Sequence, residues 1–209
     1  MNRSIRVYLL SFIFSLTTLS CVSLVLEDVV RKEVTILNNQ HRRSLANGEV
    51  KNAAGTPMPK ATDMNQIKYN KELEAKAQDW AAKCDIQKEA PAGVLIYHSK
   101  DTMDHATAMV KAFDHWWKQV EKYDTTNVKY TVDSAMKFGD FAQVALSQNK
   151  AVGCAIEKCQ GTFVVCSYDA ILEIGKPIYK TGTPCTQCDP SKKQCQRGLC
   201  SSCIPKRKS

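Results

Sequence analysis

The sequence lacks the motifs that nucleotide-dependent and metal-dependent enzymes carry. It has no glycine-rich loop that could cradle a phosphate, and only 9 of its 209 residues are glycine. It has four histidines, but no His-Glu-x-x-His pattern of the kind that binds zinc in proteases. Zinc-finger, RNP-like and basic-helix patterns are also absent. We therefore expect neither nucleotide chemistry nor a nucleic-acid partner.

Long hydrophobic runs are missing beyond the N-terminus. Residues 1–20 place two arginines before an apolar run at 7–14, which is shorter than the roughly 20 residues needed to cross a bilayer. This layout predicts a secretory signal peptide, cleaved after Ser20 or as late as Ser23. We therefore expect a secreted, extracellular protein in which disulfides persist. Removing the two arginines from the 29 basic residues leaves 27 against 21 acidic ones, a net charge of +6 that favours acidic surfaces or glycans.

Helical periodicity dominates the first two thirds of the chain. Apolar residues at three- and four-residue spacing predict a helix over about residues 27–46, and a long loop with glycines and prolines follows at 47–69. Asn70 can cap a second helix. The buried stripe of that helix is expected to be Leu73, Ala77, Trp80 and Cys84. The same spacing predicts a third helix over 102–123 and a shorter fourth over 138–147.

The period then changes from helical spacing to alternation. Residues 152–156 and 162–166 alternate around a Gln-Gly turn, which predicts a β-hairpin. Cys159 and Cys166 flank this turn, and we expect the paired strands to bring them close enough for a disulfide. Helices followed by an antiparallel hairpin predict an α+β fold.

The C-terminal segment, residues 181–209, holds five cysteines and almost no apolar residues. Two Cys-x-x-Cys pairs, Cys185 with Cys188 and Cys200 with Cys203, could be read as a four-thiolate zinc site. The spacing between the pairs is shorter than in usual zinc ribbons, and Cys195 would be left over. Because a signal peptide precedes the chain, we favour a short appendage stapled by disulfides.

Several ordered motifs resemble the CAP superfamily, which includes cysteine-rich secretory proteins, antigen 5 and plant pathogenesis-related proteins. They are residues 39–48 (NQHRRSLANG), 59–65 (PKATDMN), 72–81 (ELEAKAQDWA) and 164–168 (VVCSY). The likeness is greatest to venom-allergen-like and Ancylostoma-secreted-protein-like proteins of parasitic nematodes. It implies a three-layer α-β-α sandwich over residues 27–180, followed by a hinge-like cysteine-rich tail at 181–209.

Many members of this family hold two histidines and two glutamates around a central cavity that can bind a cation. The resemblance places Val94 and Gln119 where the glutamates stand, and Asp140 where a histidine stands. A valine cannot ligate a metal, and an amide is a poor substitute for a carboxylate. We therefore expect no metal or other cofactor and no catalytic acid–base pair, which makes a secreted hydrolase the weakest reading. His41 is expected to be a core residue rather than a ligand.

The resemblance also implies lipid binding. Related proteins bind sterols at an aromatic-bearing loop after the third helix, and some hold fatty acids in a channel between helices. The equivalent segment here offers Tyr123, Val128 and Tyr130 as a candidate sterol site, although the same side chains could simply pack the loop onto the core. The sequence therefore predicts a non-catalytic carrier of sterols and fatty acids. The alternative is an immunomodulatory protein that recognises a host protein or a sulfated glycan through its surface.

Cysteine arithmetic leaves the oligomeric state open. If Cys21 is cleaved away, nine of the ten cysteines remain, so one is unpaired or joins another chain. Cys203 is one candidate for that role, and a disulfide-linked or non-covalent dimer stays open. The candidates for intrachain disulfides are Cys84, Cys154, Cys159, Cys166, Cys185, Cys188, Cys195 and Cys200.

Overall fold

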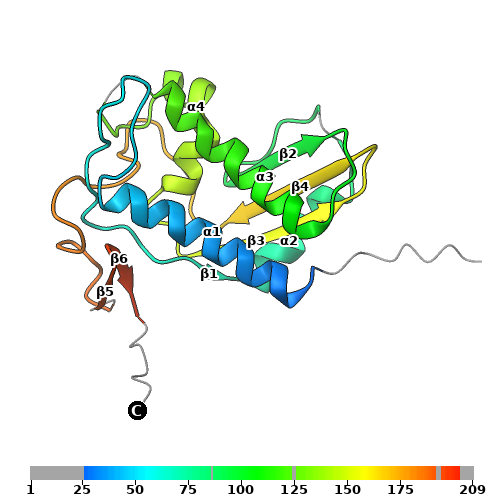
Figure 1. The fold of residues 1–209 in the computed structure, drawn as a ribbon, viewed down its shortest axis with the longest axis horizontal. Helices are drawn as coiled ribbons and strands as arrows, with labels where there is room; N and C mark the ends of the chain where they lie inside the picture. Colours follow the sequence, from blue (N-terminus) through cyan, green and yellow to red (C-terminus); the bar gives the residue numbers. More distant parts are fainter. Residues whose placement is uncertain (1–25, 86, 124–125, 192–193, 203–209) are drawn as a thin grey trace, which may run out of the picture.

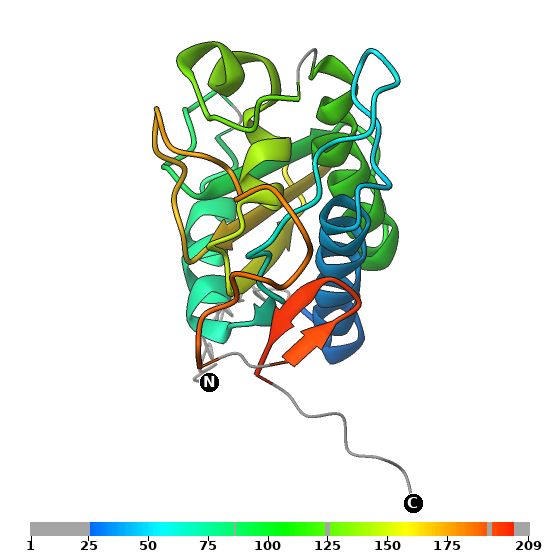
Figure 2. The same ribbon diagram turned by 90° about the vertical axis from the view of Figure 1, so that its left-hand side faces the viewer.

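A four-stranded sheet forms the middle layer of the protein in the computed structural model (Figure 1). The structure describes residues 26–85, 87–123, 126–191 and 194–202. The expected signal peptide, Cys21, Cys203 and the basic C-terminus lie outside the described residues. Helices cover both faces of the sheet, so the α+β class and the α-β-α sandwich implied by the resemblance are confirmed (Figure 2).

The sheet has the strand order β1-β3-β4-β2. Its strands are β1 (Lys68–Tyr69), β2 (Val94–Ser99), β3 (Ala151–Glu157) and β4 (Thr162–Tyr168). Strands β3 and β4 form the predicted hairpin, β2 adds to β4 antiparallel, and β1 adds to β3 parallel. Every residue of β4 is buried because helices pack on both of its faces.

The register of the hairpin corrects the disulfide expected between Cys159 and Cys166. Cys154 lies directly opposite Cys166 in the ladder, and these two cysteines are bonded. Cys159 lies beyond the end of β3 and pairs instead with Cys84. A hairpin pairs residues that are equally distant from its turn. Cys159 is much closer to the turn than Cys166 is, so these two cysteines do not lie opposite each other.

Helices α1 (Asp28–Ala46) and α3 (His105–Trp117) lie on one face of the sheet, and α2 (Lys71–Ala81) lies on the other (Figure 2). Helix α1 matches its prediction within one residue. The Asn70 side chain caps α2 as expected, by accepting hydrogen bonds from the backbone N–H groups of Glu72 and Leu73. None of the helices in the described part of the chain has the length and apolar character that a membrane span requires.

Several helix boundaries differ from the sequence prediction, and among them α3 begins three residues later than predicted and α4 ends two residues earlier. Helix α3 ends at Trp117 and continues as a 3₁₀ helix, η1 (Lys118–Lys122), while α2 ends before Cys84, which is exposed rather than part of the buried stripe. Helix α4 (Val132–Ala145) begins six residues earlier than predicted, capped by the Thr131 side chain. Its first two turns are mostly exposed and therefore lack an apolar stripe that periodicity could detect.

The C-terminal segment is joined to the rest of the fold by packing and hydrogen bonds. Strands β5 (Gln194–Gln196) and β6 (Leu199–Ser201) form a small hairpin beside α1 (Figure 2). Leu199 is fully buried in the cluster that contains Leu45 and Tyr179, and the backbone N–H of Cys200 donates to the carbonyl of Met64. One apolar side chain and two disulfides thus replace the core that this segment lacks.

Candidate functional site

Gln119 in η1 and Asp140 in α4 form a closed hydrogen-bonded pair. The Gln119 Nε2 donates to Asp140 Oδ2 over 2.7 Å, and the Gln119 Oε1 accepts from the backbone N–H of Asp140 at 3.0 Å and of Phe141 at 3.3 Å. Both side chains are half-buried. The side-chain amide therefore uses both of its polar atoms to hold the carboxylate and the backbone of α4 in place.

Burial raises the pKa of Asp140, and the Gln119 hydrogen bond opposes this rise. Within the described residues, the hydrogen-bond partner of the Asp140 carboxylate is an amide, which cannot accept or release a proton at neutral pH. General acid–base catalysis requires a titratable group within hydrogen-bond reach of its substrate and usually a second one to complete proton transfer. Gln119 cannot supply that second group, and the ionisable side chains of His115 and Lys122 act on the Asp140 carboxylate through their charge. The hydrogen bonds of the pair itself fit a structural role.

Val94, the third substituted position, lies apart from this pair. It packs with Trp80, Ala77 and Phe163 on the face of the sheet that α2 covers. Its neighbour Leu95 belongs to the core cluster on the opposite face, with α1 and α3. The structure therefore brings together two of the three positions implied by the resemblance, and Val94 does not join them.

An aromatic stack lies beside the Gln119–Asp140 pair. His41 stacks on Trp117 with 4.5 Å between ring centroids, and Trp117 meets Phe141 edge-on at 5.0 Å. Burial lowers the pKa of His41, which favours its neutral form. Trp116, which precedes Trp117 in α3, is fully buried and donates its indole N–H to the carbonyl of Ile96. His41 thus packs as an aromatic ring, but it is half-buried rather than the core residue that the sequence predicted.

The candidate sterol segment is packed onto the core. Tyr123 is fully buried, its ring lies 4.2 Å from that of Phe138, and its hydroxyl donates to the carbonyl of Asn127. Val128 is buried in the same cluster. Both side chains therefore pack into the core, which is the alternative that the sequence left open.

Tyr130 is the member of the set that stays half-buried. Burial, together with the nearby Asp140 carboxylate, raises the pKa of its hydroxyl. The backbone around it is tied to the segment before Tyr179: the Tyr130 N–H donates to the Lys176 carbonyl, the Gly175 N–H donates to the Tyr130 carbonyl, and the Ile178 N–H donates to the Val128 carbonyl. These three hydrogen bonds hold residues 128–130 in place.

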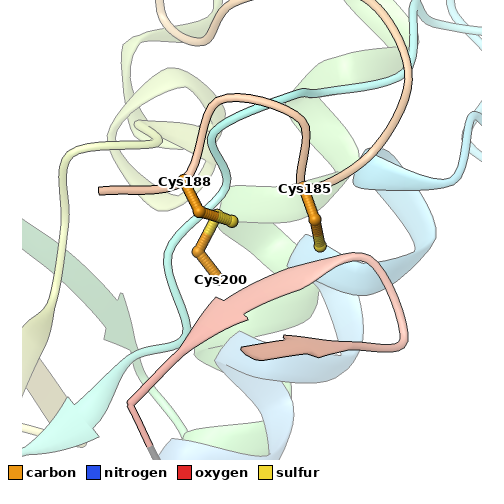
Figure 3. Close-up of side chains that lie close together, drawn as sticks. All are labelled: Cys185, Cys188 and Cys200. Carbon is orange, nitrogen blue, oxygen red and sulfur yellow. A yellow bond between two sulfur atoms is a disulfide. The ribbon is translucent and has the colours of Figure 1, made fainter. Parts of the chain in front are cut away.

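Three cysteines of the C-terminal segment lie close together, and the sequence left two readings for them, a zinc site or disulfides. Cys185, Cys188 and Cys200 have their sulfurs within 4.8 Å of one another, and they are the one such group of potential ligands in the described part of the chain (Figure 3). However, Cys188 is bonded to Cys200, and Cys185 is bonded to Cys195. Sulfurs in disulfides are not thiolates, so this cluster does not offer the ligands that zinc requires.

A groove that the sequence did not reveal lies between α1 and the start of α2. It has a volume of about 590 Å³, its surface is mostly apolar, and Ile36 and Tyr69 are among its lining side chains. Lys32, Lys71 and the exposed Asp28 also line it. Neither lysine forms an ion pair with a described residue, but the charges of both act on the Asp28 carboxylate and help to lower its pKa, after the larger effect of Arg31. Ile36 is 55% exposed although it is apolar. Its position off the buried stripe of α1 was the only sequence signal for this groove.

A bidentate ion pair beside this groove, which we call the Arg31–Glu74 clamp, joins α1 to α2. Arg31 on α1 donates from Nε and Nη2 to the two carboxylate oxygens of Glu74 on α2, at 2.8 Å and 2.7 Å. Tyr69 donates its hydroxyl to the same carboxylate. Burial acts to raise the pKa of Glu74, but the hydrogen bonds from Arg31 and Tyr69 outweigh it and lower that pKa. The bidentate pair therefore joins the two helical layers around the edge strand β1.

Comparison with known sequences gives consistent matches. A sequence model described as the cysteine-rich secretory protein family, CAP, matches residues 36–168. The "Ancylostoma secreted protein" of Ancylostoma caninum is 32% identical over 84% of this chain and 45% of its own length. "Peptidase inhibitor 16" of Mus musculus is 28% identical over 78% of this chain and 32% of its own length. This chain thus spans about half and about a third of the lengths of these two relatives.

Solved structures agree with the sequence matches. "NaASP2 with Zn2+" superimposes with a TM-score of 0.77 and 30% identity, over 84% of this chain and 96% of that one. "BmVAL-1" gives a TM-score of 0.76 and 28% identity, over 86% and 97%. The "Hookworm Platelet Inhibitor" gives 0.62 and 26%, over 77% and 80%. These likenesses confirm the resemblance drawn from the sequence motifs.

Proposed function

The chain belongs to the cysteine-rich secretory protein (CAP) family, and from that premise we propose that it is a secreted, non-catalytic protein that binds fatty acids and sterols where a parasite meets its host. Four disulfides among the described residues fit an oxidising, extracellular setting. The closed pair of Gln119 and Asp140 supports the non-catalytic part, since an amide stands where the resemblance implies a second carboxylate, and that amide engages the one carboxylate that is present.

The groove between α1 and α2 is the observation that carries the proposal. Its volume of about 590 Å³ lies within the range of about 300–1,000 Å³ that is typical of small-molecule sites. The apolar surface of the groove suits an acyl chain, because each buried methylene contributes about 0.8 kcal/mol. The ammonium groups of Lys32 and Lys71 can attract a carboxylate at the rim. A fatty acid combines these two chemical properties.

Sterol binding at the 123–130 segment requires a change of conformation. Tyr123 and Val128 are buried. A planar sterol could reach them only if Tyr123 moved away from Phe138 and the backbone hydrogen bonds of Val128 and Tyr130 to residues 175–178 broke. Tyr130, already half-exposed, would make the first contact. We therefore assign fatty acids to the groove and sterols to an opened form of this segment.

The groove is tested by comparing two exposed apolar residues changed to the same charge. Ile36→Glu places a carboxylate in the groove, whereas Met136→Glu changes a side chain on α4 that is 76% exposed and does not line the groove. Titration with the fluorescent fatty acid cis-parinaric acid should show affinity lowered by roughly tenfold, or about 1.4 kcal/mol, for Ile36→Glu and unchanged for Met136→Glu. Wild-type affinity in both variants would contradict the groove as the site.

A second titration tests the sterol part. Tyr130→Ala should weaken cholesterol binding, and Tyr130→Phe should retain it if the ring supplies the contact. Cis-parinaric acid binding should be unchanged in both variants, because Tyr130 does not line the groove. Cholesterol binding that is equal in all three proteins would remove this segment from the proposal.

Recognition of a host protein or glycan through the surface remains the second candidate. It is supported by the likeness to the hookworm platelet inhibitor, whose name assigns that protein an effect on host platelets. The double variant Ile36→Glu, Tyr130→Ala separates the candidates. If its effect on host cells equals that of the wild type while lipid binding is lost, surface recognition is the main role.

A further inference from the structure

A second cavity lies on the face of the sheet that α2 covers. It has a volume of about 580 Å³, which is large enough for a drug-sized molecule. One wall is α2, which contributes Leu73, Lys76 and Trp80 from the same side of the helix. The opposite wall consists of residues 91–94 and of 169 and 171, and the floor includes Ser167 of β4.

The position of α2 explains why this space stays open. Ser167 lies between Gly153 and Val94 in the same cross-strand row. The first turn of α2 sits directly on Gly153, where an added Cβ would lie 2.0 Å from the Glu74 nitrogen and 2.5 Å from the Asn70 carbonyl oxygen. The backbone of α2 thus lies where a side chain on β3 would otherwise be. Ser167 on β4 and Val94 on β2, the neighbours of Gly153 in this row, lie beside the helix and line the cavity.

The floor of the cavity carries an unsatisfied polar atom. Ser167 is only 3% exposed, and its Oγ is buried and has no hydrogen-bond partner among the residues that the structure describes. The residues that precede it on the same face of β4, Phe163 and Val165, are apolar core residues. Leaving a buried hydroxyl without a partner costs about 1–3 kcal/mol, so its presence in a strand that is otherwise apolar on this face indicates a partner from outside the chain.

The surroundings of Ser167 define the chemistry of that partner. Trp80, Leu73 and Val94 offer apolar surface beside it. The charged groups of the lining, Glu72, Lys76 and Asp169, include both signs, and Asp169 Oδ1 already accepts from two backbone N–H groups. These three residues are exposed, whereas Ser167 is buried, so an ionised ligand group placed at Ser167 would lose its hydration.

We propose that this cavity binds a neutral and mostly apolar small molecule whose hydroxyl group exchanges a hydrogen bond with Ser167 Oγ. Because this Oγ is buried, the ligand reaches it only when side chains that line the cavity shift. The phenol class has these properties: an aromatic body that packs against Trp80 and Leu73, and one polar end for the floor. The site is separate from the fatty-acid groove, because the two sets of lining residues have no member in common. The proposal therefore does not rest on lipid binding.

A pair of probes tests the role of the hydroxyl. 2-Naphthol and naphthalene differ by that group, and binding of each is followed through the amide NMR shifts of Leu73, Gly93, Val94 and Ser167. In Ser167→Ala, the affinity for 2-naphthol should fall by about fivefold, which corresponds to one hydrogen bond, and the affinity for naphthalene should stay the same or rise. Thermal stability should not fall, since the variant removes an unpaired buried hydroxyl.

A second pair of variants tests the location. Ala92→Trp fills the mouth of the cavity and should abolish binding of both probes, while Ala75→Trp adds the same ring to an exposed position of α2 outside it and should leave binding intact. Three results would overturn the proposal: shifts located elsewhere in the protein, an equal loss of both probes in Ser167→Ala, or no binding of either probe, which would mean that the cavity holds only water.

Discussion

Arg42 carries the largest stability effect that we expect from a single residue. Its side chain is 0% exposed and donates hydrogen bonds to the backbone carbonyls of Asn65, Val144, Leu146, Ser147 and Asn149. Burial lowers its pKa to about 10, so the guanidinium stays charged at pH 7. Two of the carbonyls lie at the C-terminal end of α4, where the helix dipole favours a cation. Arg42 thus caps α4 from α1.

The expected loss for Arg42→Met follows from the carbonyls that remain. Leu146 and Ser147 keep a second donor, the backbone N–H groups of Asn149 and Asn65 respectively. Val144 and Asn149 lose the donor that the guanidinium supplies to their carbonyls, and the Asn65 carbonyl loses the two hydrogen bonds that it accepts from Arg42. Counting only the Val144 and Asn149 carbonyls, at about 2 kcal/mol for each, the loss is about 4 kcal/mol. Removing the desolvated charge returns part of this free energy, which leaves a net loss of about 3 kcal/mol.

Urea unfolding with the disulfides intact, followed by tryptophan fluorescence, measures this change. Arg42→Met should lower the free energy of unfolding by about 3 kcal/mol, and Arg42→Lys by about half as much, because an ammonium has fewer donors. The control is Arg43→Met on the same helix. Arg43 is half-buried, and its buried Nε has no hydrogen-bond partner in the part of the chain that the structure describes. A loss below about 1 kcal/mol for Arg42→Met, or an equal loss for Arg43→Met, would refute the reasoning.

Three further changes test the packing around the candidate sites. Asp140→Asn should stabilise the protein at pH 7 and lose this advantage below about pH 3.8, because the raised pKa of Asp140 makes ionisation unfavourable in the folded state; thermal melts against pH measure this. His41→Phe keeps the stack on Trp117 and should remove the loss of stability that the wild type shows as the pH falls below 6.5, since the lowered pKa of His41 opposes protonation. Gly153→Ala should cost about 2 kcal/mol or more in urea unfolding, because the new methyl group would collide with α2; an unchanged midpoint would show that the helix can lift freely.

Features set by neighbouring residues were predictable from the sequence. The Asn70 cap, the extent of α1 and the β3–β4 hairpin all depend on short-range patterns, and the structure has them where the sequence placed them. The start of α4 also depends on a short-range signal, the Thr131 cap. It was missed because periodicity detects only helical turns that bury a stripe.

Features that join distant parts of the chain were not predictable in this way. The carbonyls of Val144 and Leu146 that Arg42 binds lie 102 and 104 residues further along the chain, and the bond between Cys84 and Cys159 spans 75 residues. The candidate site shows the same limit. Motif likeness placed Val94 beside Asp140, but the alternation of β2 directs Val94 to the opposite face of the sheet.

Helix α2 links the two small-molecule sites proposed for this protein. Glu74 accepts both hydrogen bonds from Arg31, which lines the fatty-acid groove, while Leu73 on the adjacent position faces the cavity above Ser167. The first turn of α2 cannot move toward the sheet, because the backbone of Glu74 already touches Gly153. A ligand that widened the groove would therefore have to break the Arg31–Glu74 clamp or pull α2 away from the sheet. In the second case the cavity would open at the same time, so the rigidity of this turn determines whether the two sites act independently.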